Sequence, residues 1–427
     1  MVRSLLSVII CIGWLYLTEC FYISFGRGQM GSVGRVKVND NLALPVWPVV
    51  PGVVSLVLEK LGLKSLGQGF LKKVGGRVIP MSIDEVSPFL LLVHHRHSFA
   101  PFDPFRVVTN AVLPEGFSAH PHSGFDTLTY CLEGGLKHRD SEGLAMSYGD
   151  GDAQWMRAGR GTIHEEMWDV DKAPTKKERF QKIELFQIWL DLPPESKSVP
   201  PQTHLLEAAA IPTVHCGGGG GGGGPRSGTS GASLKVLTGR VGTTGGASGV
   251  VCAQGPGSAR GIALTPMSVL HVRVPAGETT DLVVCCDAED NRHGQVCSAF
   301  IYVAEGRLLD PQCDIDAPFG TSVVQQWPSC VVSRAEERPR VRLAAAEGGD
   351  DLSVLVLIGE AVADGRGAKS GPFVARDEAA LGMIGRAFSR VNERGGFWAP
   401  SLSDSDWHAH VNKLQLQDLL REEMRLD

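Results

Sequence analysis

The chain contains no cysteine pair spaced as Cys-x-x-Cys, although ten cysteines are spread over its 427 residues. This absence argues against a zinc ribbon and against a thioredoxin-type redox motif. Basic residues are not in excess either, because the formal net charge is −6. The sequence therefore lacks the charge pattern of a nucleic-acid-binding protein, and we expect no direct binding of nucleic acid. It also lacks a basic run of the nuclear-localisation type.

No apolar run near the N-terminus is long enough to span a membrane comfortably. Arg3 precedes a short apolar run over residues 5–17, and cleavage after Cys20 would put Thr18 and Cys20 at positions −3 and −1. We therefore expect residues 1–20 to be a signal peptide, with a membrane anchor or an untargeted terminus as alternatives. A signal peptide implies the secretory pathway or, with Phe21 directly after the cut, entry into a plastid. Without it, the cytoplasm or the nucleus is expected.

The rest of the chain shows little helical period before its C-terminal tail. Residues 21–75 are predicted to be a linker of low order, and residues 205–231, which include an uninterrupted glycine tract at 217–224, a disordered linker. Between and after them, short apolar runs broken by Gly and Asp turns predict two all-β blocks, 76–204 and 232–362. In the tail, 363–427, apolar stripes predict helices over 377–391 and 411–426 that cover the barrels.

Two short segments carry metal-binding residue types at strand spacing. His120 and His122 are two residues apart, as are His164 and Glu166, so each pair would share one face of a strand while Glu165 points away. Three imidazoles and a carboxylate suit a first-row transition metal with open coordination positions. Each segment alone is equally compatible with an ordinary polar strand end or an ordinary histidine. The interpretation depends on whether the two pairs meet.

The sequence around both pairs resembles the pirin family, a branch of the cupin superfamily with two barrels. The resemblance rests on HPHSGFDTLTYCLEGGLKHRDSEG from residue 120 and GDAQWMRAGRGTIHEEM from residue 151, and continues through QIWLDLP at 187–193. It extends more thinly through FIY at 300–302, IGE at 358–360 and GPFV at 371–374. It implies an all-β protein of two cupin (jelly-roll) barrels with a C-terminal helix, of which 76–204 binds metal and 232–362 does not.

Carried over from the family, the metal ligands fall on His120, His122, His164 and Glu166. The resemblance implies Fe(II) first, with Mn, Ni, Cu or Zn as alternatives. Asp126 stands where many cupins carry Glu, but in the pirin pattern this position is not a ligand. His271, alone in a strand of the second block, is expected to be a packed or surface residue.

The resemblance implies an Fe(II)-dependent dioxygenase that acts on a flavonol such as quercetin, in the manner of quercetin 2,3-dioxygenase. In that chemistry O2 adds across the C2–C3 bond of the deprotonated flavonol and carbon monoxide is released, with Glu166 as a candidate proton acceptor. One alternative is a non-enzymatic, iron-dependent redox sensor that binds a regulatory protein. Another is a structural two-barrel protein without turnover.

Several other residues are predicted to be structural. His94 to His97 are interpreted as a turn, or else as part of the pocket mouth, and residues 137–140 (Lys-His-Arg-Asp) as a solvated hairpin end. Cys131, Trp155 and Trp189 are expected in the core.

Overall fold

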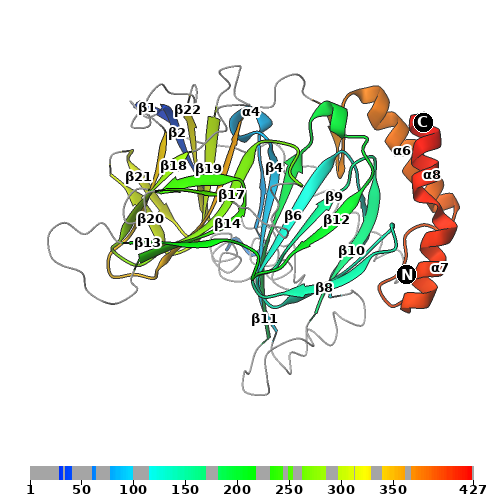
Figure 1. The fold of residues 1–427 in the computed structure, drawn as a ribbon, viewed down its shortest axis with the longest axis horizontal. Coiled ribbons are helices and arrows are strands. Elements are labelled where there is room, and N and C mark those ends of the chain that lie inside the picture. Colours follow the sequence, from blue (N-terminus) through cyan, green and yellow to red (C-terminus); the bar gives the residue numbers. More distant parts are fainter. Residues whose placement is uncertain are drawn as a thin grey trace.

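The computed structural model describes two β-barrels side by side and a group of C-terminal helices on the outer flank of the first barrel (Figure 1). The described residues are 28–31, 34–40, 60–63, 77–99, 115–169, 181–217, 231–243, 249–252, 262–284, 297–311, 313–327, 339–360 and 367–425. The predicted signal peptide at 1–20 lies outside them. Within these ranges, no helix combines the length and the apolar character needed to cross a membrane.

The first barrel consists of a six-stranded and a four-stranded antiparallel sheet. In spatial order, the larger sheet contains β12 (Gln202–Leu206), β9 (Ala153–Arg157), β6 (Phe125–Glu133), β11 (Gln181–Asp191), β4 (Phe89–Phe99) and β3 (Arg77–Pro80). The smaller sheet contains β5 (Gly116–His122), β10 (Thr162–Trp168), β7 (Gly135–Asp140) and β8 (Ala145–Gly149). Leu136, Tyr148, Trp168 and Leu185 join the two sheets in one apolar cluster.

The second barrel repeats this plan with an eight-stranded and a six-stranded sheet. The larger sheet contains β1 (Gly28–Gly31), β2 (Gly34–Asp40), β22 (Thr321–Trp327), β19 (Cys297–Glu305), β24 (Leu352–Glu360), β17 (Met267–Val274), β14 (Gly231–Thr238) and β13 (Thr213–Gly217). The smaller contains β16 (Gly249–Cys252), β15 (Arg240–Thr243), β18 (Thr279–Val284), β23 (Arg340–Ala345), β20 (Arg307–Asp310) and β21 (Ile315–Pro318). The predicted all-β class with two barrels is confirmed.

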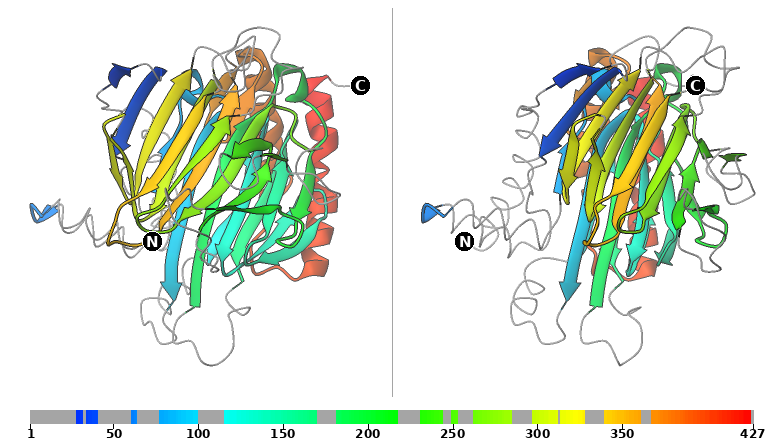
Figure 2. Two further views of the ribbon diagram at one scale, coloured as in Figure 1. Left: turned by 60° about the vertical axis from the view of Figure 1, so that its left-hand side comes forward. Right: turned by 90° about the vertical axis from the view of Figure 1, so that its left-hand side faces the viewer.

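The large sheets of the two barrels pack face to face. Leu128 and Phe186 from the first barrel share one buried cluster with Phe300 and Leu355 from the second. Because neighbouring strand residues face opposite sides, Leu270 and Val272 point into the second barrel while His271 points toward the first. Two further views show the long strands of both barrels running through this common block (Figure 2).

Two segments predicted to be linkers contain strands that extend the second barrel. β2 lies within the predicted linker 21–75 and pairs with β22, and β13 lies within 205–231 and pairs with β14. The predicted linkers are therefore too long at these points. β13 is the edge strand of this sheet and β2 lies next to the other edge strand, β1, and such short strands give only a weak signal in the local sequence.

The C-terminal extension (residues 367–425) contains β25 (Ala368–Ser370), β26 (Phe373–Ala375), α6 (Glu378–Glu393), α7 (Asp404–Leu414) and α8 (Leu416–Met424). Asp377 caps α6 by accepting a hydrogen bond from the backbone N–H of Ala380, at 2.7 Å. The predicted helix at 411–426 is two helices, because Gln415 adopts a left-handed conformation between them (φ +48°). Short α4 (Ile83–Val86) and the 3-10 helix η3 (Pro194–Ser196) complete the fold.

The extension packs on the first barrel, whereas the sequence suggested that helices would cover both barrels. Phe388 and Leu420 share a buried cluster with Ala119 of β5 and Ile163 of β10. When the second barrel is turned forward, the red helices remain on the far side of the first barrel's strands (Figure 2). The extension therefore covers the outer face of the four-stranded sheet.

Candidate metal centre

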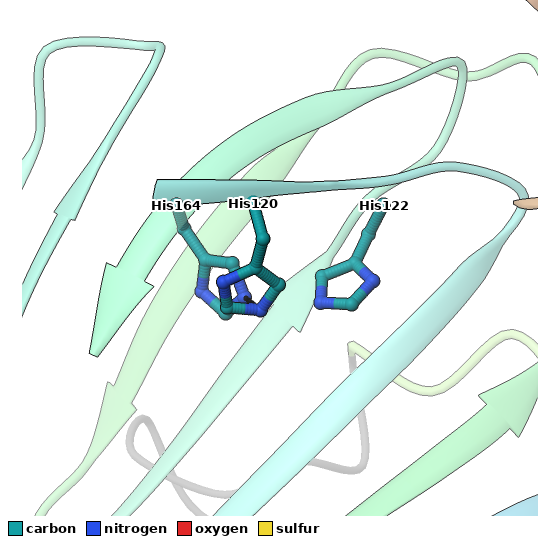
Figure 3. Close-up of side chains that lie close together, drawn as sticks. All are labelled: His120, His122 and His164. Atoms are coloured by element: carbon teal, nitrogen blue, oxygen red, sulfur yellow. Dashed lines mark hydrogen bonds between the residues drawn. The ribbon is translucent and has the colours of Figure 1, made fainter. Parts of the chain in front are cut away.

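Three histidines from two neighbouring strands meet inside the first barrel. β5 and β10 are antiparallel, and their register places His164 opposite His120 and Thr162 opposite His122. His120 and His122 share a face of β5 because they are two residues apart, and directly opposed residues lie on the same face of the sheet. The imidazoles consequently point into one space (Figure 3). The two sequence segments therefore do meet.

The spacing of the three imidazoles suits a metal ion. The Nε2 atoms of His120 and His164 are 3.0 Å apart, and one ligand nitrogen from each of the three histidines lies within 4.8 Å of the others. Two nitrogens bound at right angles to a first-row metal at 2.0–2.1 Å would be about 3.0 Å apart. Within the described part of the chain, these are the only three side chains grouped closely enough to hold a metal.

The hydrogen bonds of His120 fix its tautomer. Its Nδ1–H donates to the backbone carbonyl of Ser118, at 2.7 Å. In the neutral ring, Nε2 then carries a lone pair that faces His164. A metal-binding histidine commonly donates its other ring N–H to a carbonyl in this way, which orients the ring.

Burial keeps the three histidines in the form that binds metal. It lowers the pKa of His120 below its ordinary value, and it lowers the pKa values of His122 and His164 still further, where neighbouring imidazoles act in the same direction. Neutral imidazoles are therefore the stable form near pH 7. Because metal ligands must be deprotonated, binding here requires little release of protons.

Glu166 lies on the same strand but outside the three-histidine group. Its Oε1 accepts a hydrogen bond from the Thr129 hydroxyl at 3.2 Å, and its Oε2 accepts one from the Gln187 side-chain amide at 2.7 Å. Glu165 points to the opposite face, as the strand period predicts, and accepts a hydrogen bond from Arg139 Nε at 2.5 Å. The structure thus brings three of the four predicted ligands together and places the fourth beside them.

Aromatic side chains flank the imidazoles. Trp189 packs against His122 with ring centroids 5.2 Å apart and against Phe125 at 4.6 Å. Phe117 stands edge-on to His120 at 6.4 Å. His120 and Phe117 are half-buried, whereas His122 and His164 are buried. Trp189, expected in the core, is a half-buried wall residue of the site.

A fourth imidazole lies close to the group. His138 is fully buried, its ring centroid is 5.4 Å from that of His164, and its Nε2 is 3.1 Å from Asp140 Oδ2. The prediction of a solvated hairpin end for residues 137–140 is therefore wrong. The segment belongs to β7, which pairs with β10 and places His138 opposite Glu166 inside the barrel. The polar composition of residues 137–140 gave no sign that His138 is buried, because the interior of a metal site is polar as well.

The turn predicted at His94 to His97 is also wrong, because these residues lie within β4. His94 Nδ1 is 2.8 Å from the Tyr302 hydroxyl between the barrels, and the ring of His95 stacks on Trp168 at 4.6 Å. Pairing with β11 continues along the whole of β4. His94 and His95 are both buried although they point to opposite faces of the strand, and a polar strand of this kind resembles a loop when only its local sequence is considered.

The predictions for Asp126, Cys131 and His271 are confirmed. Asp126 faces the barrel interface and accepts a hydrogen bond from Trp155 Nε1 at 2.7 Å, and burial raises its pKa to about 6. Burial raises the pKa of the buried Cys131 thiol to about 12. His271 lies between Tyr130 and Ser353, and burial lowers its pKa to about 3.

The interior of the second barrel differs from that of the first. Its apolar core in the described residues consists of aliphatic side chains with cysteine and one tryptophan, and no three His, Cys, Asp or Glu side chains described there are grouped to hold a metal. The first barrel instead encloses buried ring nitrogens that no other side chain satisfies by a hydrogen bond, namely both nitrogens of His122 and the Nδ1 atoms of His138 and His164. Such buried polar atoms are costly unless a ligand, metal or water satisfies them.

The fold and the site together define a protein of the two-barrel cupin class with one candidate metal centre, in the first barrel. The Pirin family model matches residues 72–190, which contain the three histidines. The chain is 31% identical over 279 residues to a candidate quercetin 2,3-dioxygenase of Pseudomonas aeruginosa. The aligned part covers 64% of this chain and 76% of that protein. The chain belongs to the pirin family.

Other relatives match shorter parts. Pirin of Rattus norvegicus is 34% identical over 157 residues, or 36% of this chain and 45% of that protein. A crystal structure of quercetin 2,3-dioxygenase from Acinetobacter baumannii superposes with a TM-score of 0.54 at 24% identity, covering 76% of this chain and 94% of that one. This likeness supports the two-barrel fold.

Proposed function

We propose that the protein is a mononuclear metal-dependent dioxygenase that acts on a flavonol such as quercetin, with O2 as co-substrate. The observation that carries the proposal is the convergence of three neutral imidazoles, with His120 and His164 Nε2 atoms 3.0 Å apart, beside a hydrogen-bonded carboxylate. The name of the Pseudomonas relative adds the substrate class. Fe(II) is the metal we favour, and Mn, Ni, Cu and Zn suit the same donors.

His120, His122 and His164 would hold the metal, with Glu166 as a fourth ligand after a change of side-chain rotamer. The metal would supply Lewis acidity and open coordination positions for small ligands. In the observed orientation Glu166 is held by Gln187 and Thr129. Each carboxylate oxygen has a second lone pair, so Glu166 can accept the proton of a phenolic hydroxyl without leaving these two partners.

The aromatic wall suits a flat phenolic substrate. Trp189 and Phe125 lie against one side of the histidine group, and Phe117 lies at the more exposed side. Offset or edge-on contacts between aromatic rings contribute about 0.5–1.5 kcal/mol each beyond buried area. Gln187, whose side-chain carbonyl is 3.4 Å from Trp189 Nε1, links this wall to Glu166.

The test is to measure bound metal and quercetin-dependent O2 uptake in the purified protein and in two variants. We expect His164→Ala to abolish both. His204→Ala is the matched control, because His204 is half-buried in β12 outside the site, and it should retain both. Metal bound at wild-type level without uptake for quercetin or related flavonols would refute the dioxygenase assignment.

A second candidate, an iron-dependent redox sensor, is favoured by one observation. The outer face of the metal-bearing sheet is covered by the C-terminal extension, so the site is structurally connected to the molecular surface. Bound iron without O2 uptake would support this function and a regulatory protein partner. Absence of metal would refute both candidates and leave a structural two-barrel protein.

We also propose that residues 1–20 direct the protein into the secretory pathway or a plastid. The basic residue, apolar run and small residues of this segment support the proposal. N-terminal sequencing of the protein from its native source tests it. A mature chain that begins at Phe21 is expected, and a chain that retains residues 1–20 would contradict it.

A further inference from the structure

We propose that the C-terminal extension is a positioning element of the metal centre, acting through Gln417 and Ser123, and that metal binding and docking of the extension are coupled. This inference rests on the metal centre proposed above. The residues concerned lie far from the histidines in the sequence, but they contact the two turns that adjoin the ligand-bearing strands.

The first step is that the two turns are tied to each other. Ser123 follows His122 directly, and its hydroxyl donates to the carbonyls of Arg160 at 3.0 Å and Gly159 at 3.3 Å. The backbone N–H of Gly124 also donates to the Gly159 carbonyl, at 2.7 Å. The turn at Gly159–Gly161 leads directly into β10, which carries His164. A shift of one turn therefore changes the separation of the imidazoles.

The second step is that β26 and the residue before it hold the first turn. The backbone N–H of Ser123 donates to the Pro372 carbonyl at 3.2 Å, and the N–H of Val374 donates to the Ser123 carbonyl at 2.8 Å. The approach is so close that a Cβ on Gly124 would lie 1.6 Å from the Val374 carbonyl oxygen. The chain beside His122 is thus pressed between the extension and the second turn.

The third step is that α8 holds the second turn. The Gln417 side-chain amide donates to the Gly161 carbonyl at 2.9 Å and to Glu142 Oε1 at 2.7 Å, and its oxygen accepts from Arg160 Nε at 2.7 Å. Leu420, one turn later on α8, packs onto Gly161, where an added Cβ would lie 2.9 Å from its Cδ1. One glutamine thereby fixes both sides of the turn that precedes His164.

The fourth step is that α6 and α8 support the backs of the ligand-bearing strands. Ala119 and Ile163 each adjoin a metal-site histidine in sequence, and they point outward into the cluster formed by Ile384, Phe388 and Leu420. Inward imidazoles and outward apolar residues thus belong to the same short strands. The sheet cannot move relative to the extension without disturbing this packing.

These contacts predict that metal binding and docking of the extension favour each other. A metal site requires its ligands within a few tenths of an ångström, and loss of supporting hydrogen bonds typically weakens metal binding roughly 10- to 100-fold. If the extension favours the binding geometry, metal must by linkage favour the docked extension by the same factor. Metal binding should therefore slow local opening of α6 and α8, although they make no contact with the metal.

The experiment uses the full chain with Mn(II) as the probe. Its dissociation constant is measured by calorimetry for the wild type, Gln417→Ala and the control Asp418→Asn. Asp418 is the next residue on α8 and is 67% exposed. Amide hydrogen exchange over 378–424 is then compared with and without Mn(II). We expect Gln417→Ala to weaken Mn(II) binding roughly tenfold, Asp418→Asn to change it less than twofold, and Mn(II) to slow exchange in the wild type.

A second variant separates loss of the Gln417 hydrogen bonds from misfolding caused by truncation of the side chain. Gln417→Met keeps the length of the side chain but removes all three hydrogen bonds, so it should weaken Mn(II) binding as much as Gln417→Ala does. Mn(II) binding that is equal in all variants, with unchanged exchange in α6 and α8, would overturn the coupling and leave the proposed function intact. No Mn(II), Fe(II) or Zn(II) binding by the wild type would overturn both.

Discussion

Replacing Gly124 with alanine tests the contact between the metal-site turn and the C-terminal extension. Gly124 has a left-handed backbone, with φ +82°, and the added Cβ would lie 1.6 Å from the carbonyl oxygen of Val374. Ordinary van der Waals contact begins near 3.4 Å, so β26 would have to retreat by about 2 Å. The substitution therefore separates the extension from the turn while leaving the histidines themselves unchanged.

The expected cost has two parts. A left-handed conformation costs a non-glycine residue about 1–2 kcal/mol. Retreat of β26 would also break the two backbone hydrogen bonds between Ser123 and residues 372 and 374, each worth about 1 kcal/mol net. We therefore expect Gly124→Ala to lower the free energy of unfolding by about 3–4 kcal/mol and to weaken metal binding.

Gly143→Ala is the matched control. Gly143 has nearly the same backbone, with φ +83°, but the nearest atom to its added Cβ is 3.8 Å away, on His408. Gly143→Ala should lower the free energy of unfolding only by the cost of the left-handed conformation, about 1–2 kcal/mol. Its affinity for metal should be unchanged. Urea unfolding measures the free energy of unfolding, and calorimetric titration with Mn(II) measures the metal affinity. Equal destabilisation of the two variants would refute the reasoning, because the contact with Val374 would then contribute nothing.

Three other side chains, His271, Cys131 and Trp189, can each be tested separately. His271 has a pKa of about 3 in the folded chain, so the unfolded chain takes up its proton first as the pH falls below about 6.5. Between pH 7.5 and 5, urea unfolding should show that wild type loses about 2 kcal/mol more stability than His271→Gln, and an equal loss would contradict the assignment. Cys131, with a pKa of about 12, should resist iodoacetamide at pH 8 until urea unfolds the chain, as followed by peptide mass spectrometry. Trp189→Ala should raise KM for quercetin more than it changes bound metal, measured by steady-state O2 uptake and metal analysis, and an unchanged KM would exclude Trp189 from the substrate wall.

The local sequence was sufficient for the positions of the three histidines. A strand places residues i and i+2 on one face, and this rule alone puts His120 beside His122 and separates Glu165 from Glu166. The family resemblance supplied the expectation that His164 and Glu166 join this pair in one site, which the strand period cannot give. The same period separates His271 from Leu270 and Val272 in the second barrel. Inward and outward residues could thus be distinguished wherever a strand was recognised.

The parts that sequence did not predict all depend on contacts between distant segments. Gln187 and Thr129 hold Glu166, but they come from β11 and β6, and only the barrel brings them together. His138 was misinterpreted because a polar strand inside a metal chamber has the composition of a surface hairpin. The role of Gln417 depends on a helix more than 250 residues after Gly161. No local pattern signals such a partnership.

The two barrels differ in their interiors, and this difference indicates a separate role for each barrel. Both have alternating strands and a shared apolar interface, but the second barrel has an aliphatic core, and its described residues contain no group of His, Cys, Asp or Glu side chains spaced to hold a metal. Its last strand, β24, instead leads the chain into the extension, which returns to the first barrel and closes over the turns beside His122 and His164. We infer that the second barrel influences the candidate metal centre by positioning the C-terminal extension. On this reasoning, substitutions in its interior should affect metal binding only to the extent that they displace residues 372–374 and 417 or the facing strands β6 and β11.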